Sequence, residues 1–434
     1  MTFDQAIALL VLSMVVGALI WNRVRADVVA LTGAAALLAT GVVRPVEVQT
    51  AFASPALIAL ASLFVIAYAL ELSGLMGLLI RRATSLCSRI GSLGLWVVIA
   101  LCGAGSAFLN NTPIVVLAAP VVRDVAQSMS LPPRRFLIPL SYVTVLAGSC
   151  TLIGTSTNLL VNDMARNAGQ PTFGLFEMTP VALLVAAAGG LYLFFFGERL
   201  LGKAVRNGER EEAHPPRRPA DDAGLGDAEV FDVNPSLDPY KAVAAAAVFL
   251  AVVGVAGMGI APIASVAFAG AVLLILMRVI RVDEAYRGLR PDVLLLIAGM
   301  VVIGIAMEVT GLAEAATGSL IDGIRTLGPW MALVLLYGVT LFLTEILSNA
   351  AVAVLLTPVA VALAESLDAS PRPFLIAVML AASYAFATPF GYQTNVLVYQ
   401  LGKYSYMDFV RVGLPLNLLT WAVAVAAIPA FFPF

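Results

Sequence analysis

Charged side chains, histidine and cysteine are all scarce in this chain. Of its 434 residues only 12% are charged, one is histidine and three are cysteine. Soluble globular proteins carry about 25% charged residues. This chain has instead 61% hydrophobic residues and a mean hydropathy of +0.96. These values exclude a water-soluble globular protein and predict an integral membrane protein.

The few reactive side chains are not arranged for catalysis. Cys87, Cys102 and Cys150 lie in or beside apolar segments, at spacings unlike those of a metal site or a disulfide framework. We interpret them as small core residues. His214 lies in a charged segment. Intramembrane hydrolases and redox proteins usually need His, Asp or Cys clusters at depth, so we expect no enzyme activity, no organic cofactor and no nucleic-acid partner.

Long apolar runs separated by short charged breaks predict a bundle of membrane-spanning helices. The expected full spans are residues 4–22, 26–43, 55–80, 136–166, 177–197, 240–258, 260–277, 291–316, 373–400 and 409–432. The predicted fold class is therefore an all-α polytopic membrane protein.

Two further apolar segments contain a polar tip. Asn110-Asn111-Thr112 interrupts residues 92–122, and Ser348-Asn349-Ala350 interrupts residues 328–364. At 1.5 Å per residue, an arm from Pro113 to Val122 would reach only about 15 Å, half of the roughly 30 Å hydrocarbon core. Both segments are therefore predicted to be re-entrant hairpins, whose polar tips must face protein or a water-filled cavity.

The two halves of the chain match one another. At offsets of 237 or 238 residues, the matched pairs include Asn111 and Asn349, Pro120 and Pro358, Arg134 and Arg372, Gly154 and Gly391, Asn158 and Asn395, and Glu71 and Glu308. Each half has five full spans, an odd number, so the second copy is expected to be inverted relative to the first.

The predicted domains follow from this duplication. The first repeat covers residues 1–198, with a hairpin at about 92–128 and a broken helix at 136–166. The second repeat covers residues 240–434, with a hairpin at about 328–366 and a broken helix at 373–400. Residues 199–239 are polar and rich in proline, which predicts a flexible cytoplasmic linker; a regulatory docking site is the alternative.

Lys and Arg are distributed unevenly among the loops. If both termini are outside, the cytoplasmic loops hold every Lys and Arg except Arg44, Arg166, Arg325 and Arg372. The positive-inside rule therefore predicts a plasma-membrane protein, the bacterial inner membrane being expected, with both termini outside.

Besides the two tips, two spans are interrupted by polar sequence. The break "GSCTLIGTSTN" covers residues 148–158 and the break "ATPFGYQTN" covers residues 387–395. Two tips and two breaks that enter from opposite faces can converge near the middle of the membrane. They would offer the amide oxygens of Asn111, Asn158, Asn349 and Asn395 and the hydroxyls of Thr112, Thr151, Thr155, Ser156, Thr157 and Thr394.

Such a cluster suits ions of both signs. Neutral oxygens at close quarters suit Na⁺, and the unpaired N–H groups of half-helices suit an anion. The alternative is that the polar side chains only join helices. Three intramembrane carboxylates, Glu71, Glu308 and Glu345, leave a proton-relay role open beside a structural one.

At this point the paired motifs resemble the divalent anion:sodium symporter family (solute carrier family 13), which has a Ser-Asn-Thr triplet at each tip and a polar break in each half. The form "PFGYQTN" looks like the sulfate-type branch, without the TrkA-C-like insert that many members carry in the linker. The resemblance implies a homodimer and an elevator-type movement.

The resemblance also implies roles for individual residues. The first sodium site would be framed by Asn110, Asn111, Thr112, Gly154 and Asn158, and the second by Ser348, Asn349, Thr388 and Asn395. Substrate contacts would come from Asn111, Thr112, Ser156, Thr157, Asn349, Gln393 and Thr394. Ala350 departs from the family threonine, and Thr157 and Gln393-Thr394 replace prolines, so the pocket differs from that of a typical dicarboxylate carrier.

The sequence therefore predicts a Na⁺-coupled symporter that imports a small divalent oxyanion, sulfate before a dicarboxylate, with Na⁺, the anion and membrane lipid as its partners. Within the same superfamily, a proton-coupled carrier or an exchanger is the alternative, and Glu345 would be its titrating group. A passive anion channel is the alternative from another class.

Overall fold

The computed structural model describes residues 2–21, 23–75, 77–79, 82, 91–207, 237–312 and 328–434. Within these ranges every regular element is an α-helix and no strand occurs. The predicted all-α class is confirmed. Cys87, His214 and Arg325 lie outside the described residues.

The helices follow the same order in both halves of the chain. The first half contains α1 (Phe3–Trp21), α2 (Ala26–Ala39), α3 (Pro45–Phe52), α4 (Pro55–Leu72), α6 (Ser92–Ser106), α7 (Asn111–Ser128), α8 (Arg134–Gly148), α9 (Ser156–Asn167) and α10 (Thr179–Asn207). The second half contains α11 (Pro239–Gly257), α12 (Ile263–Leu276), α13 (Val282–Gly288), α14 (Pro291–Val309), α16 (Gly328–Thr344), α17 (Asn349–Ser366), α18 (Pro371–Ser383), α19 (Gln393–Leu401) and α20 (Tyr406–Phe431). The duplication read from the sequence thus extends to the helices.

Six helical segments of the described part are long and apolar enough to cross a membrane. They are Pro45–Leu72, Thr179–Gly197, Pro239–Gly257, Pro291–Val309, Asn349–Ser366 and Tyr406–Phe431. Six shorter apolar helices accompany them, at Phe3–Leu19, Ala26–Ala39, Ser92–Ser106, Ile263–Leu276, Gly328–Thr344 and Pro371–Ser383. The chain is therefore a multi-pass membrane protein, and ten full crossings remain a prediction.

The second arm of the first tip is helix α7, which ends at Ser128, the expected end of the hairpin. Its part from Pro113 to Val122 is apolar, and Arg123 and Asp124 follow in the same helix and form an ion pair 3.0 Å long. Although its 18 residues span about 27 Å, α7 is not among the described helices that are apolar enough to cross a membrane. The re-entrant course of both hairpins stays a prediction.

Two short helices, α3 and α13, were not anticipated from the sequence. Each is capped at its N-terminus by a capping box, in which the glutamate three residues on accepts from the backbone N–H of the N-cap arginine: Glu47 from Arg44 and Glu284 from Arg281. Each then leads into a long helix that begins at a proline, a residue suited to the first helical position. The predicted linker also begins later than expected, because α10 continues to Asn207.

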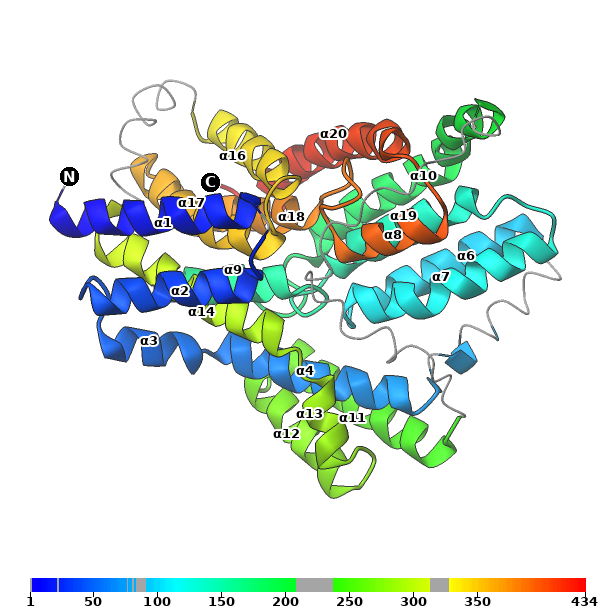
Figure 1. The fold of residues 1–434 in the computed structure, drawn as a ribbon, viewed down its shortest axis with the longest axis horizontal. Helices are drawn as coiled ribbons and strands as arrows, with labels where there is room; N and C mark the ends of the chain where they lie inside the picture. Colours follow the sequence, from blue (N-terminus) through cyan, green and yellow to red (C-terminus); the bar gives the residue numbers. More distant parts are fainter. Residues whose placement is uncertain are drawn as a thin grey trace.

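The two halves exchange packing partners. Helix α2 packs on α14 and, reciprocally, α12 packs on α4; likewise α7 packs on α19 and α17 on α9. Helices α10 and α20 pack on each other. In Figure 1, α16, α20 and α10 lie along one side and α4, α11, α12 and α13 along the opposite side. This exchange is expected of two repeats related by a pseudo-two-fold axis.

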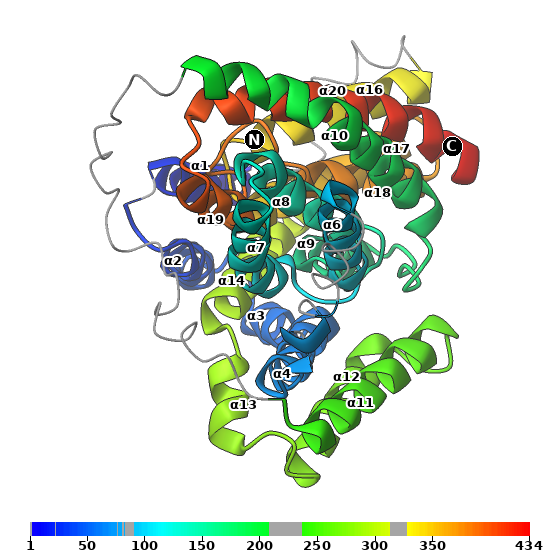
Figure 2. The same cartoon turned by 90° about the vertical axis from the view of Figure 1, so that its right-hand side faces the viewer.

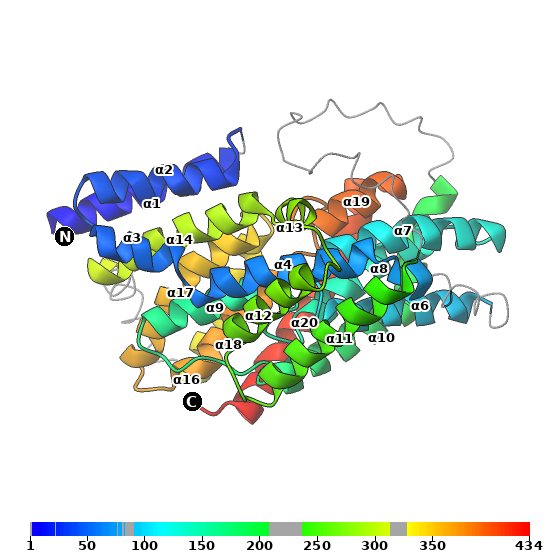
Figure 3. The same ribbon diagram turned by 90° about the horizontal axis from the view of Figure 1, so that it is seen from below.

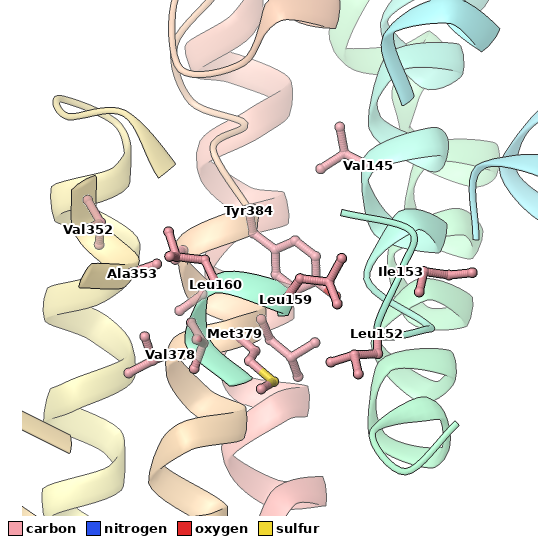
Figure 4. Packing of buried hydrophobic residues seen from close by; sticks show 14 of the residues in the cluster. Val145, Leu152, Ile153, Leu159, Leu160, Val352, Ala353, Val378, Met379 and Tyr384 are labelled. Carbon is pink, nitrogen blue, oxygen red and sulfur yellow. The ribbon is translucent and has the colours of Figure 1, made fainter. Parts of the chain in front are cut away.

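The broken helices are packed among other helices, and most residues of α8, α9 and α18 are buried. In Figure 2, which looks at the end of the molecule that carries α7, the ribbons of α8 and α9 project onto the middle of the view. Figure 3 shows α1 and α2 at the end opposite α6 and α7. Figure 4 shows Leu159 and Leu160 of α9 between α17, α18 and the residues that precede α9. Both leucines are buried, as are Val352 and Met379 on the facing helices. Close packing therefore fixes the start of α9, where the first break ends.

Two ion pairs join the halves at matched places. Arg134, at the start of α8, contacts Asp408 at the start of α20 with an Nη2–Oδ2 distance of 2.8 Å. Arg372, at the start of α18, contacts Glu177 just before α10 with an Nη1–Oε1 distance of 2.7 Å. The Asp408 side chain is only 1% exposed, whereas the Glu177 side chain is 29% exposed. The two pairs are therefore equivalent in position and different in burial.

This difference predicts unequal effects on stability. Asp408→Asn should lower the free energy of unfolding by about 3–5 kcal/mol, because it leaves the guanidinium of Arg134 without its buried partner. Glu177→Gln should lower it by about 1 kcal/mol or less, because water screens the more exposed pair. Thermal unfolding of the detergent-solubilised variants measures both effects. Equal shifts for the two variants would contradict this account.

Candidate functional site

Backbone oxygens from the first tip and the first break converge beside Gly154. A Cβ atom on Gly154 would lie 2.2 Å from the Gly148 oxygen, 2.6 Å from the Ala107 oxygen and 2.9 Å from the Ser106 oxygen. The position therefore admits only glycine. Three carbonyl oxygens near one point concentrate partial negative charge, which favours a cation or N–H donors nearby.

Asparagine side chains stand beside these oxygens. Asn111 is 1% exposed, accepts a short hydrogen bond from Ser106 Oγ, and lies so close to Gly148 that a Cβ there would be 2.6 Å from Asn111 Oδ1. Asn158 is fully buried and donates to the Thr151 oxygen over 2.9 Å. Its own Oδ1 is buried with no hydrogen-bond partner among the described residues. Such an oxygen is available to a ligand.

The first tip also contacts the second break. Asn111 Nδ2 donates to Tyr392 Oη over 2.9 Å, and Thr112 Oγ1 donates to Gln393 Oε1 over 3.2 Å. Helices α7 and α19 therefore start at the same place, one from each half of the chain. Gln393 is exposed, whereas Thr394 beside it is fully buried. The structure thus brings Asn111, Thr112 and Gln393 together.

The second tip repeats the first in part. Thr344 Oγ1 donates to Asn349 Oδ1 over 2.9 Å, as Ser106 Oγ does to Asn111 Oδ1. Asn395 Nδ2 lies 3.4 Å from the Thr388 oxygen and donates to the Ala385 oxygen over 2.9 Å. Unlike Asn158, Asn395 has a partner for its Oδ1, since Ser141 Oγ lies 2.7 Å away.

A carboxylate replaces part of the carbonyl cluster in the second half. Glu345 Oε1 accepts from the backbone N–H of Ala387 over 2.7 Å and from Asn417 Nδ2 over 2.7 Å. Its Oε2 accepts from the backbone N–H of Thr388 over 2.9 Å and from Thr388 Oγ1 over 2.8 Å. Four donors thus surround the carboxylate, and Glu345 joins the end of α16 to the second break and to α20.

The other predicted residues lie along the same elements. Ser348 caps α17 by accepting from the Ala351 N–H, and Thr157 donates its N–H to the capping Thr155 Oγ1. Asn110, Gly154 and Ser156 line a small cavity of about 30 Å³ against the apolar side of α4. That volume is enough for a water molecule.

The carboxylates Glu71 and Glu308 lie elsewhere. They occupy the last turns of α4 and α14, where Glu71 is half-buried and Glu308 is exposed in the single chain. Among the side-chain bonds described for the structure, none links either of them to the tips or breaks. The proton-relay alternative therefore gains no geometric support from this pair.

Sequence reasoning missed several residues of this region. Tyr392 joins the halves through its hydroxyl, and Asn417 of α20 reaches Glu345. Gly413 of α20 lies against the Phe386 carbonyl, because a Cβ there would be 1.8 Å from that oxygen. Arg290, the residue before α14, donates from Nη1 to Gln393 Oε1 over 3.4 Å. Arg290 lies in a charged loop, and no sequence motif marks it.

Comparison with known proteins identifies the family. The family model described as citrate transporter (CitMHS) matches residues 16–368. The chain belongs to this family. It is an anion transporter of the solute carrier family 13 kind, so the resemblance read from the tips and breaks is confirmed.

Relatives and solved structures agree with this placement. An uncharacterized transporter of Synechocystis is 25% identical, with 95% of this chain and 94% of the relative covered. The sodium/sulfate cotransporter 1 of Chlamydomonas reinhardtii is 34% identical over 157 residues, which cover 36% of this chain and 18% of the relative. The solved YdaH transporter of Alcanivorax borkumensis has a TM-score of 0.60 at 16% identity, with 88% of this chain and 86% of that chain covered, and thus shares the fold.

The four donors around Glu345 predict the effect of replacing its carboxylate by an amide. Glu345→Gln should lower the free energy of unfolding by about 1–3 kcal/mol, because the new amide N–H₂ faces groups that themselves donate. Glu365→Gln is the matched control, since Glu365 is exposed near the end of α17. Thermal unfolding measures both. An unchanged melting temperature for Glu345→Gln would show that these hydrogen bonds do not stabilise the break.

Proposed function

We propose that this transporter imports a small divalent oxyanion, sulfate before a dicarboxylate, in symport with Na⁺. The relatives named sodium/sulfate cotransporters support both the anion class and the cation. The observation that carries the proposal is the meeting of α7 and α19 through the Asn111–Tyr392 and Thr112–Gln393 hydrogen bonds. Two helix N-termini at one place supply N–H groups and positive dipole ends for an oxyanion.

The proposed anion contacts are those expected from the sequence, Asn111, Thr112, Ser156, Thr157, Asn349, Gln393 and Thr394. Exposed Gln393 lies at the accessible edge of the group, and buried Thr394 lies behind it. Hydroxyl and amide groups of this kind match the oxygens of sulfate without requiring a buried salt bridge.

We propose a first Na⁺ site among Asn110, Asn111, Thr112, Gly154 and Asn158. The converging carbonyl oxygens beside Gly154 and the unpartnered Asn158 Oδ1 support it. The second proposed site, at Ser348, Asn349, Thr388 and Asn395, has fewer side-chain oxygens that are free to bind a cation. Thr388 Oγ1 already bonds Glu345, and Asn395 Oδ1 already has Ser141. Ala350 adds no hydroxyl there.

The membrane setting completes the proposal. We place the chain as a homodimer in the bacterial inner membrane with both termini outside, moving its transport elements as an elevator. Residues 1–198 and 240–434 would form the two inverted repeats, joined by the cytoplasmic linker 199–239. The exchange of packing partners between the halves supports this division.

The alternatives predict different behaviour. A proton-coupled carrier or exchanger would need a titrating group at the site, and Glu345, whose carboxylate contacts the second break, is the candidate. A dicarboxylate carrier would share the mechanism and differ only in substrate. A passive anion channel would dissipate a gradient and never accumulate the anion.

Uptake of ³⁵S-sulfate into proteoliposomes that contain the purified protein tests the proposal. We expect accumulation above the outside concentration only with an inward Na⁺ gradient, and competition by thiosulfate and molybdate. Uptake of succinate but not sulfate would identify the dicarboxylate alternative. Accumulation that follows a proton gradient instead of a Na⁺ gradient would contradict Na⁺ coupling, and gradient-independent equilibration would indicate a channel.

The two tip asparagines give a second prediction. Asn111→Ala and Asn349→Ala should each abolish Na⁺-driven uptake, because each removes an amide oxygen from a tip while leaving the helices and the proposed dimer folded. Size-exclusion chromatography of each variant is the folding control. Normal uptake by both variants would exclude the proposed site.

A further inference from the structure

Arg290 brings a positive charge to the place where α7 and α19 begin. Its Nη1 donates to Gln393 Oε1 over 3.4 Å, and the same oxygen accepts from Thr112 Oγ1 over 3.2 Å. The contact joins the junction between α13 and α14 to the start of α19, which lie next to each other in Figure 3. Arg290 thus contacts one of the proposed substrate residues and lies within one hydrogen bond of another.

The guanidinium of Arg290 is loosely paired. Its Nη2 lies 3.3 Å from Asp292 Oδ2, and the two side chains are 28% and 34% exposed. Charge-assisted N–H···O bonds are usually about 2.7–2.9 Å long, the length of the Arg134–Asp408 pair. Because both side chains are partly exposed, water screens the pair, and Arg290 can leave Asp292 at little cost.

We propose that Arg290 is a substrate-binding residue, whose guanidinium moves from Asp292 onto the oxyanion held at Thr112 and Gln393. The planar guanidinium presents paired N–H donors that match two oxygens of sulfate or of a carboxylate. Asp292 then competes with the anion for the same cation. This inference rests on the proposed function, because it assigns a further residue to the same site.

The contact between Arg290 and Gln393 is not explained by a role in which Arg290 only adds positive charge to its loop. Arg281, in the same charged segment, illustrates such a role: it caps α13, is 77% exposed, and lies 4.0 Å from the carboxylate of Asp283. The contacts described for Arg281, from its backbone N–H to Glu284 and from its guanidinium to Asp283, do not reach the tips or breaks. Arg290 differs from it by pointing its guanidinium at Gln393. Arg281→Gln is therefore the matched control for Arg290→Gln.

Sulfate uptake kinetics in proteoliposomes test the proposal. Arg290→Gln should raise KM for sulfate by at least about tenfold while the maximal rate stays within about twofold, since a hydrogen bond to a charged group is lost from the bound state. Arg290→Lys should recover part of the affinity, because it keeps the charge and loses the paired donors. Arg281→Gln should leave KM unchanged.

Asp292→Asn should change KM for sulfate in the opposite direction to Arg290→Gln. Removing the competing carboxylate should lower KM for sulfate several-fold, whereas a merely structural Arg290–Asp292 pair would make both variants weaken uptake. Size-exclusion chromatography shows whether Arg290→Gln folds. If it does not, Asp292→Asn and Arg290→Lys still decide whether Arg290 binds the anion or only pairs with Asp292.

The outcomes separate this inference from the function on which it rests. Wild-type protein that takes up neither sulfate nor succinate would overturn the proposed function and this inference together. Wild-type uptake with an unchanged KM in Arg290→Gln, or a raised KM in Asp292→Asn, would overturn the role of Arg290 alone. A raised KM in Arg290→Gln with a lowered KM in Asp292→Asn would support it.

Discussion

The structure depends on one constraint: a helix that breaks among apolar neighbours exposes backbone N–H and C=O groups that must find partners inside the protein. Here each tip lies against a break and each break against a tip or another helix. The N–H groups of Ala387 and Thr388 bond Glu345 behind the second tip. The Ala107 oxygen behind the first tip accepts from Thr151 in the first break. The polar cluster is therefore as much a requirement of folding as of transport.

The two halves meet this constraint with different chemistry. The first half gathers neutral backbone oxygens beside Gly154, whereas the second half places the carboxylate of Glu345 among four donors. Among the residues that the structure describes, each region keeps a buried amide oxygen without a hydrogen-bond partner, Asn158 Oδ1 in the first and Asn417 Oδ1 in the second. Duplicated sequences have thus diverged into one region of backbone oxygens and one built around a carboxylate. An ion that needs oxygen ligands meets unequal environments in the two copies, although the helices around them still correspond.

Local pattern predicted much of this architecture. The all-α class, the duplication and the positions of the tips and breaks follow from apolar runs and from matched residues such as Asn111 and Asn349. The short helices α3 and α13 were not anticipated, because neither contains an apolar run that marks it. Partners far apart in sequence could not be found at all: Asn417 meets Glu345 across 72 residues, and Arg290 meets Gln393 across 103. Such contacts depend on tertiary packing, which a single sequence does not encode in any local motif.

The exchange of partners between the halves also determines the order in which the protein can be completed. Helix α2 packs on α14, which is synthesised about 250 residues later, and α4 likewise packs on α12. At about 5–20 residues per second, α2 is finished on the order of tens of seconds before its partner exists. The first half must therefore persist in the bilayer as an incomplete assembly with lipid in place of protein neighbours. Its biogenesis depends on the nascent helices tolerating that interval without pairing wrongly.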